Sequence, residues 1–243
     1  MTWYKEWFNS ENYLKVYGHR DETEAERLAD LITKELALQH NSSVLDMACG
    51  AGRHAIAFAK KGFDVTAVDL SERLISEAKR NGLQAKVKVD FILSDILEFN
   101  SSKQFDVAVN LFTSIGYFET DEENFAVIKK AYNLLKQDGH FILDYFNKDF
   151  LLNNLVPTSI FSENGLRIIQ NRTIEGKRIV KKITFENNNL VNEFYESVRL
   201  YSYDEMLNFF LNSGFLISKQ YGNYYGNDFE RESSPRLIIF AKK

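Results

Sequence analysis

Between residues 44 and 145, short apolar runs alternate with stretches of helical periodicity, and no other feature constrains the fold as strongly. Continuous apolar runs separated by helices are typical of parallel strands that are buried on both faces of a sheet. The sequence therefore predicts an α/β protein with a doubly wound sheet. The expected strands are Val44–Met47, Val65–Asp69, Val89–Leu93, Val107–Phe112 and Phe141–Tyr145.

Helical spacing of apolar residues predicts the elements that cover this sheet. One helix is expected before the first strand, from Thr23 to Leu38. Ser71 and Asp121 have side chains that accept hydrogen bonds at helix starts, so both are expected N-caps. The helices between the strands are expected at Arg53–Lys61, Glu72–Asn81 and Glu122–Leu135, and the connection Ile96–Gln104 is too short for one.

The pattern changes after Asn147, where strands joined by short turns predict an antiparallel meander. The turns are expected at Glu175–Lys177 and Asn187–Asn189, because Gly and Asn tolerate turn conformations. We expect a main domain of residues 1–149 and 202–243, interrupted by a β subdomain of residues 150–201 that forms a lid over the substrate pocket. The strands of the insertion are expected at Arg167–Glu175, Arg178–Glu186 and Asn192–Leu200.

Helical spacing resumes after the insertion, behind a potential N-cap at Ser202. The helix is expected at Asp204–Leu211, and Gly214 is a suitable residue to end it. Two β-rich runs follow, Leu216–Tyr221 and Leu237–Ala241. They predict a closing hairpin and therefore an antiparallel last strand in the sheet.

A glycine-containing bend follows the first expected strand and leads directly into a helix. Gly50 and Gly52 let the backbone pass close to a ligand, and the helix start at Arg53 offers unpaired N–H groups to it. Asp69 ends the second strand, where its carboxylate can accept hydrogen bonds from both ribose hydroxyls of a nucleotide. The alternative is a tight turn and an acid that caps the helix after Ser71. Together the two features favour nucleotide binding.

Two nucleotide cofactors fit this bend. The spacing of Gly50, Gly52 and Ala55 satisfies the dinucleotide fingerprint, so an NAD(P)-dependent reductase remains an alternative. Asp46 precedes the bend, where it would approach the cationic end of S-adenosylmethionine (SAM) rather than a pyrophosphate. Asp95 ends the third strand and is well placed for an adenine amino group. These acids and the closing hairpin favour SAM.

The chain resembles the class I SAM-dependent methyltransferases over most of its length. Their ordered motifs are matched by Asp46-x-Ala48-x-Gly50-x-Gly52, Val68-Asp69-Leu70-Ser71, Ser94-Asp95-Ile96 and Phe105-Asp106-Val107-Ala108-Val109-Asn110, with Ala48 in place of the first usual glycine. The resemblance implies a Rossmann-like sheet of seven strands, SAM as cofactor, and in-line methyl transfer to an N or O atom of a small molecule. The expected cofactor-binding residues are Tyr17, Arg20, Asp46, Ala48, Cys49, Gly50, Gly52, Asp69, Leu70, Asp95, Ile96 and Asn110.

The insertion resembles that of small-molecule N-methyltransferases, including those that act on amino sugars and glycine. In such relatives, aromatic and basic residues near the N-terminus close over the cofactor, which implies the same for Tyr17 and Arg20. Arg20 could pair with the SAM carboxylate or be a surface charge. Tyr224 and Tyr225 are expected pocket walls, with packing under a surface loop as the alternative. The expected substrate-pocket residues are Tyr13, Thr113, Tyr117, Tyr224 and Tyr225.

Composition bears on partners and location. The formal net charge of −4 disfavours nucleic acid as a partner, because phosphate binding needs a basic surface. The single cysteine, Cys49, fits a reducing compartment, and no run is apolar enough for a signal peptide or membrane span, so a cytoplasmic location is expected. No metal-ligand or Ser-His-Asp pattern is visible, and no catalytic residue is assigned. A SAM-binding protein without turnover remains an alternative, and the insertion's strands could pair with a second subunit in a homodimer.

Overall fold

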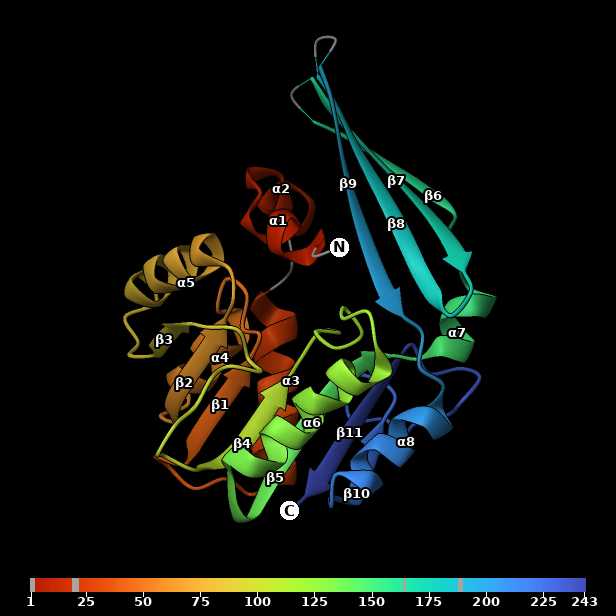
Figure 1. Ribbon diagram of the computed structural model, residues 1–243. Helices are drawn as coiled ribbons and strands as arrows, with labels where there is room; N and C mark the ends of the chain where they lie inside the picture. Colours follow the sequence, from red (N-terminus) through yellow and green to blue (C-terminus); the bar gives the residue numbers. More distant parts are fainter. Residues whose placement is uncertain (1–2, 19–21, 164, 188–189) are drawn as a thin grey trace.

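The computed structural model describes residues 3–18, 22–163, 165–187 and 190–243. Seven strands form its main sheet (Figure 1). They are β1 (Ser43–Met47), β2 (Asp64–Asp69), β3 (Asp90–Leu93), β4 (Phe105–Asn110), β5 (Leu135–Phe146), β10 (Leu216–Tyr221) and β11 (Arg236–Lys242).

The order of the strands in this sheet is β10-β11-β5-β4-β1-β2-β3. Strands β1 to β5 are parallel, whereas β11 runs antiparallel to both of its neighbours, β5 and β10. The predicted Rossmann-like sheet of seven strands with an antiparallel last strand is therefore confirmed. The order reverses between β1 and β4, the point at which open α/β sheets bind their ligands.

Helices cover both faces of the main sheet, which is why strand β1 is buried along its whole length. On one face, Val44 packs into a core with α3 (Glu22–Glu35), α4 (Arg53–Lys60) and α5 (Glu72–Gln84). On the other face, Leu45 packs with α6 (Asp121–Leu134) and α8 (Tyr203–Asn212). Neighbouring residues of a strand point to opposite faces, so both must be apolar in this sheet.

Helix boundaries differ from the sequence-based expectation by a few residues. The first expected helix ends at Glu35 rather than Leu38, and Ala37 has a positive φ of 46°. Thr120, not Asp121, caps α6, because its hydroxyl accepts from the Glu123 N–H while the Glu123 side chain accepts from the Thr120 N–H. The expected N-caps Ser71 and Ser202 are confirmed.

The insertion forms a separate antiparallel sheet of four strands rather than the expected three. Its strands are β6 (Thr158–Glu163), β7 (Leu166–Glu175), β8 (Arg178–Asn187) and β9 (Leu190–Arg199), preceded by the short helix α7 (Lys148–Asn153). The expected turn at Glu175–Lys177 is present, whereas residues 188 and 189 of the second expected turn lie outside the described residues. The additional strand, β6, lies at the edge of the sheet and pairs only with β7.

Two short helices that the sequence analysis did not identify precede α3. Helices α1 (Trp3–Asn9) and α2 (Glu11–Tyr17) lie between α5 and β9, beyond the carboxyl ends of the parallel strands (Figure 1). Trp7 and Val16 are buried there against Ile183 and Phe185 of the inserted sheet, in a third hydrophobic cluster. The N-terminal helices therefore join the main domain to the insertion.

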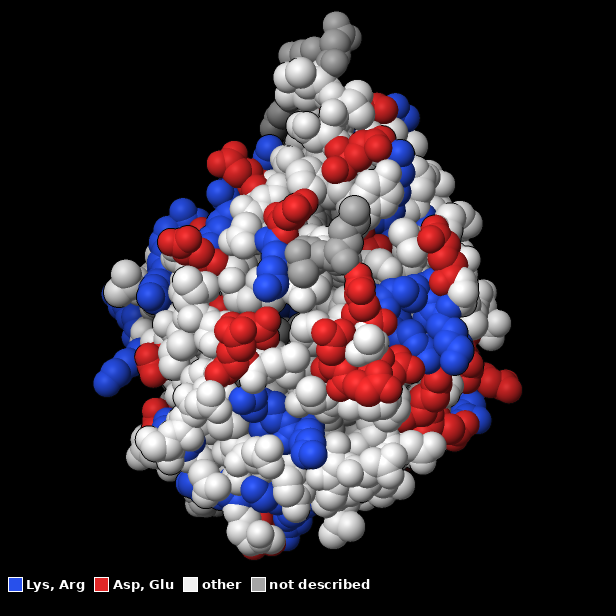
Figure 2. Space-filling model, in the orientation of Figure 1, with Lys and Arg blue, Asp and Glu red and all other residues white. Residues whose placement is uncertain are grey.

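The surface and the helices bear on the expected partners. In the described part of the chain, no helix is long and apolar enough to cross a membrane. Acidic and basic side chains are interspersed over the face shown in Figure 2. The cytoplasmic location and the absence of a nucleic-acid partner stay predictions.

Candidate cofactor and substrate site

A cavity of about 760 Å³ lies beyond the carboxyl ends of the parallel strands. We call residues 46–52, Asp69 and Asp95 the floor of this cavity, and helices α1 and α2 with strands β7 to β9 its roof. Floor and roof both contribute to the lining. Of the residues expected from the sequence, the cavity brings together Tyr13, Tyr17, Ala48, Cys49, Gly50, Asp69, Leu70, Asp95, Ile96, Thr113 and Tyr117.

The glycine bend faces the carboxylate of Asp69. The Gly50 N–H donates to Asp69 Oδ2 at 2.7 Å, and the Ser71 N–H donates to Oδ1 at 2.9 Å. The Leu70 N–H also contacts this carboxylate, and because a carboxylate offers about four acceptor positions, acceptor capacity remains for a hydroxyl donor. Gly50 has a φ of +57°, and a Cβ there would meet nothing within 4 Å. The open space beside Gly50 and Asp69 is therefore part of the cavity and suits a ribose.

The other small residues of the bend shape the floor in different ways. Ala48 has a left-handed φ of 66°, which costs an L-residue roughly 1 kcal/mol. Gly52 does not line the cavity: a Cβ at Gly52 would approach the Phe91 ring to 2.9 Å and Ala78 Cβ to 3.0 Å. Gly52 therefore allows close packing beneath the bend rather than contact with a ligand.

Asp46 and Asn110 lie behind the cavity lining. The Asn110 side chain donates to the Met47 carbonyl at 2.8 Å and so braces the end of β1. Asp46 is 1% exposed, and its Oδ2 has no hydrogen-bond partner among the described residues. Burial, reinforced by the charge of Asp69, raises the pKa of Asp46 to about 7. A cationic group in the cavity would favour the ionised form of Asp46.

The loop after β4 has a strained backbone where it borders the cavity. Phe112 and Thr113 have positive φ values of 60° and 61°, so β4 ends at Asn110 and not at the expected Phe112. The buried Asp144 of β5 holds this conformation: its Oδ2 accepts from the Phe112 N–H at 2.9 Å, and its carbonyl accepts from the Thr113 N–H at 2.8 Å. Arg236 Nε donates to Asp144 Oδ1, and Arg236 Nη2 donates to Thr113 Oγ1.

The two tyrosines expected as pocket walls do not line the cavity. Tyr224 is buried, and its hydroxyl donates to Asp144 Oδ2 at 2.8 Å. Tyr225 is 73% exposed and packs against the guanidinium of Arg27. Both tyrosines therefore pack within or around a surface loop, which was the alternative interpretation, and do not form walls of the pocket. Arg20 lies outside the described residues.

Tyr17 lies in the roof rather than in the floor. Its hydroxyl donates to both carboxylate oxygens of Glu196, at 2.6 and 2.8 Å, and accepts a hydrogen bond from Lys181. Trp7 Nε1 donates to the same carboxylate at 2.7 Å. Tyr13 packs against the Tyr17 ring, with the ring centroids 5.0 Å apart. These contacts hold the N-terminal helices against the inserted sheet.

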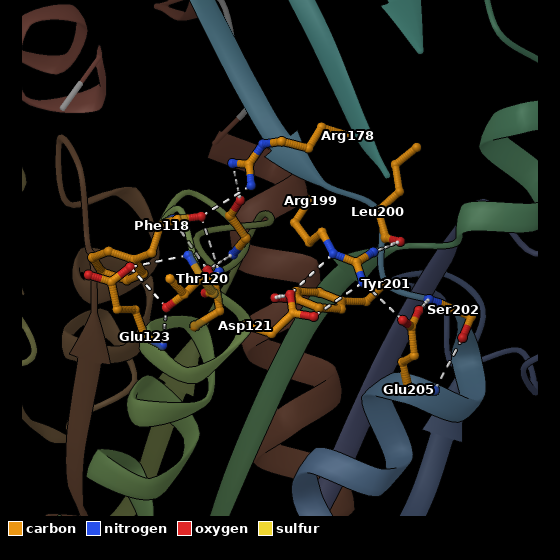
Figure 3. A network of polar contacts seen from close by, with 12 residues as sticks. Phe118, Thr120, Asp121, Glu123, Arg178, Arg199, Leu200, Tyr201, Ser202 and Glu205 are labelled. Carbon is orange, nitrogen blue, oxygen red and sulfur yellow. Dashed lines mark hydrogen bonds and ion pairs between the residues drawn. The ribbon is translucent and has the colours of Figure 1, made fainter. Parts of the chain in front are cut away.

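Arginines at the ends of β8 and β9 attach the insertion to the loop after β4 (Figure 3). Arg178 donates to the Gly116 and Phe118 carbonyls at 3.0 and 3.1 Å. Arg199 binds Asp121 and Glu205 on helices α6 and α8. Tyr117, which lines the cavity, is therefore flanked by two carbonyl groups that the insertion holds in place.

Several lining residues were not identified from the sequence. The many aromatic residues among the first eight could have indicated the lining residues near the N-terminus. The two expected turns determine which residues of β7, β8 and β9 lie opposite one another, and could have indicated the lining residues of the insertion. Within the described residues, no three His, Cys, Asp or Glu side chains form a group that could hold a metal ion. The lining residues missed include Trp3, Tyr4, Phe8, Arg53, Phe112, Arg172, Lys181, Glu196 and Arg236.

Residues 44–139 match the family model described as "Methyltransferase domain". A putative methyltransferase of Bacillus subtilis, YqeM, is 31% identical over 130 residues, which are 53% of this chain and 52% of that protein. The dTDP-3-amino-3,4,6-trideoxy-alpha-D-glucopyranose N,N-dimethyltransferase of Streptomyces venezuelae is 30% identical over 121 residues, 50% of this chain and 48% of that one. The chain thus spans about half the length of the curated relatives it matches.

Solved structures resemble the whole fold. A SAM-dependent methyltransferase from Clostridium acetobutylicum superposes with a TM-score of 0.81 at 20% identity, over 95% of both chains. CalS10, an amino pentose methyltransferase from Micromonospora echinaspora, has a TM-score of 0.69 at 19% identity, over 96% of this chain and 97% of that one. These comparisons confirm the resemblance expected from the sequence: residues 44–139 match a methyltransferase-domain model, and the complete fold, insertion included, occurs among SAM-dependent methyltransferases.

Proposed function

We propose that this chain, which carries a methyltransferase domain at residues 44–139, transfers a methyl group from SAM to a small-molecule acceptor. The observation that carries the proposal is the hydrogen bond between the Gly50 N–H and the Asp69 carboxylate at the edge of a large cavity. The Asp69 carboxylate keeps acceptor capacity at the cavity, which suits the hydroxyls of a ribose. Cofactors with an unmodified ribose fit such a site.

The residues of the floor and those next to it suit the parts of SAM. Asp69 would bind the ribose, and Leu70 and Ile96, which both line the cavity, would lie against the adenine. Asp95 lines the same region. The bend at Ala48–Gly50 would follow the methionine portion, where the unpaired Oδ2 of Asp46 lies just behind the lining. The acid behind the bend favours a ligand with a positive centre, such as a sulfonium, over a pyrophosphate.

The chemistry that SAM supplies is a methyl group on a good leaving group, so the protein must mainly align the acceptor and exclude water. The strained backbone at Phe112 and Thr113 faces the cavity, next to the roof. We propose that this loop and Tyr117 hold the acceptor over the methyl group. The inserted β subdomain, residues 150–201, would cover the pocket as a lid. No general base is assigned.

Calorimetric titration with SAM, S-adenosylhomocysteine and NAD tests the cofactor. We expect SAM and S-adenosylhomocysteine to bind at one site per chain and NAD not to bind. Binding of NAD alone would contradict the proposal and favour a reductase.

The acceptor and the methylated atom can be sought with deuterated-methyl SAM. Curated relatives include both the N,N-dimethyltransferase above and ubiquinone biosynthesis O-methyltransferases, so the atom differs among similar proteins. Incubation of the protein with labelled SAM and a metabolite extract, followed by mass spectrometry, should reveal a labelled product. Tight SAM binding without any labelled product would favour a binding protein without turnover.

A further inference from the structure

A row of three charged side chains crosses the inner face of the inserted sheet. Arg172 of β7 lies directly opposite Lys181 of β8, and Lys181 lies directly opposite Glu196 of β9. Residues opposite one another on adjacent strands project from the same face of a sheet. All three line the cavity. The row therefore faces the space between floor and roof.

Apolar residues lie on either side of this row on the same face. Ile179 and Val198, two residues along their strands, are opposite each other and also line the cavity. Ile183, two residues along in the other direction, is fully buried with Trp7. The charged row thus interrupts an apolar face, and charged groups in such surroundings need partners.

The charges within the row are not balanced. Glu196 is well satisfied, because Lys181, the Tyr17 hydroxyl and the Trp7 indole N–H all contact its carboxylate. Arg172 donates instead to three neutral oxygens: Ser159 Oγ, Gln170 Oε1 and the Val156 carbonyl. Within the part of the chain that the structure describes, no carboxylate forms an ion pair with Arg172.

Two positive side chains directly opposite each other destabilise a sheet. Burial lowers the pKa of Arg172, which reflects the cost of its charge at this position. Lys181 has three donors, of which Glu196 and Tyr17 use two. The row therefore keeps one excess positive charge and unused donors that face the cavity.

We propose that Arg172 and Lys181 bind an anionic group of the methyl acceptor, a carboxylate or a phosphate. The inference rests on the proposed function, since it places the acceptor between this row and the methyl group above the floor. It narrows the substrate class to small molecules that carry an acidic group at one end and the methylated atom at the other. Ile179 and Val198 would contact the apolar part of such an acceptor.

Anion binding to the intact protein tests the inference. The probes are acetate for a carboxylate and inorganic phosphate for a phosphate, each titrated with and without saturating S-adenosylhomocysteine. Sodium chloride at matched ionic strength corrects for general salt effects, and thermal unfolding reports the apparent dissociation constant. We expect one of the two anions to raise the melting temperature beyond the chloride control. Arg172→Gln should raise its dissociation constant about tenfold or more, and Lys181→Gln should act in the same direction.

Two neighbouring cations on the opposite face provide matched controls. Arg167 pairs with Glu186 and Lys182 pairs with Glu193, and neither lines the cavity. Arg167→Gln and Lys182→Gln should leave the anion response unchanged. An equal response of wild type, Arg172→Gln and Lys181→Gln, or no response beyond chloride, would overturn the inference. Failure of S-adenosylhomocysteine to bind would instead refute the proposed function, and the titrations without it would still decide whether the row binds anions.

Discussion

The floor and the roof of the cavity are built by different kinds of interaction. In the floor, backbone groups at strand ends make the decisive contacts: the Gly50 N–H binds Asp69, and the Met47 carbonyl binds Asn110. In the roof, side chains meet across long stretches of sequence, as where Trp7 and Tyr17 both bind Glu196. The floor is therefore set by the geometry of the main sheet, and the roof by the identity of particular side chains.

The difference between floor and roof matches the extent of the similarity to other proteins. The methyltransferase-domain model matches residues 44–139, which include the whole floor and none of the roof. A floor that depends on backbone geometry tolerates substitution, provided that the acids and glycines stay. A roof that depends on side chains can change with the acceptor. We infer that cofactor binding lies in the floor and acceptor choice in the roof.

The largest expected effect comes from the floor. Asp69→Ala removes the acceptor of both ribose hydroxyls, and hydrogen bonds to a charged group contribute about 1.5–3 kcal/mol each. The dissociation constants of SAM and S-adenosylhomocysteine should therefore rise at least about 100-fold in calorimetric titrations. Asp64→Ala is the control, because Asp64 lies at the exposed opposite end of β2 and pairs with Lys103. Unchanged affinity in Asp69→Ala would mean that the ribose lies elsewhere.

The second effect concerns the buried acid behind the bend. Because burial raises the pKa of Asp46 from 3.8 to about 7, the folded protein holds this proton more tightly than the unfolded chain. The free energy of unfolding should therefore fall as pH rises between these two values. Asp46→Asn should remove this dependence and stabilise the protein at about pH 8 by up to about 4 kcal/mol. Denaturant unfolding at about pH 5 and pH 8 measures both effects.

The same substitution separates stability from cofactor binding. A cationic ligand favours ionised Asp46, so the affinity for SAM should increase as pH rises through about 7 in the wild type. In Asp46→Asn the affinity should be weaker and should not follow that titration. If the affinity for SAM depends on pH in the same way in both proteins, Asp46 does not contribute to cofactor binding.

A smaller effect is expected in the roof. Trp7→Phe keeps an aromatic ring in the third cluster but removes the donor to Glu196, at a cost of about 1.5 kcal/mol. Helices α1 and α2 should then detach more often, and proteolysis near the N-terminus should accelerate about tenfold. The melting temperature of the main sheet, measured without SAM, should barely change. Trp3→Phe in the same helix is the control. A large loss of global stability instead would show that floor and roof unfold together.

The smallest effect concerns the backbone of the floor. Ala48→Gly should stabilise the protein by about 0.5–1 kcal/mol, because glycine adopts the left-handed conformation of Ala48 without strain. Ala51→Gly in the same loop should destabilise it by a similar amount, since Ala51 has no positive φ and the substitution only adds freedom to the unfolded chain. Thermal unfolding of the two variants gives the sign. Destabilisation by both changes would mean that the bend relaxes around Ala48.

The sequence could not predict the parts of the site that depend on distant contacts. Helices α1 and α2 have seven residues each, too few to be stable alone, and burial of Trp7 and Val16 against the insertion holds them. The row of Arg172, Lys181 and Glu196 follows from the expected turns, but which face of the sheet meets the cavity does not. The wrong expectation for Tyr224 has the same origin, because Asp144 lies 80 residues away from it in the chain.

The sequence by itself determined the main sheet and the floor. The run Val107–Val109 of β4 is apolar throughout, as expected for a strand that is buried on both faces. Gly50 follows β1 and Asp69 ends β2, two strands that such a sheet makes neighbours. Only the tertiary structure decided the roof and the strained loop at Phe112. The physical reason is that local periodicity encodes the type of an element, whereas the contacts between distant elements depend on how all of them pack at once.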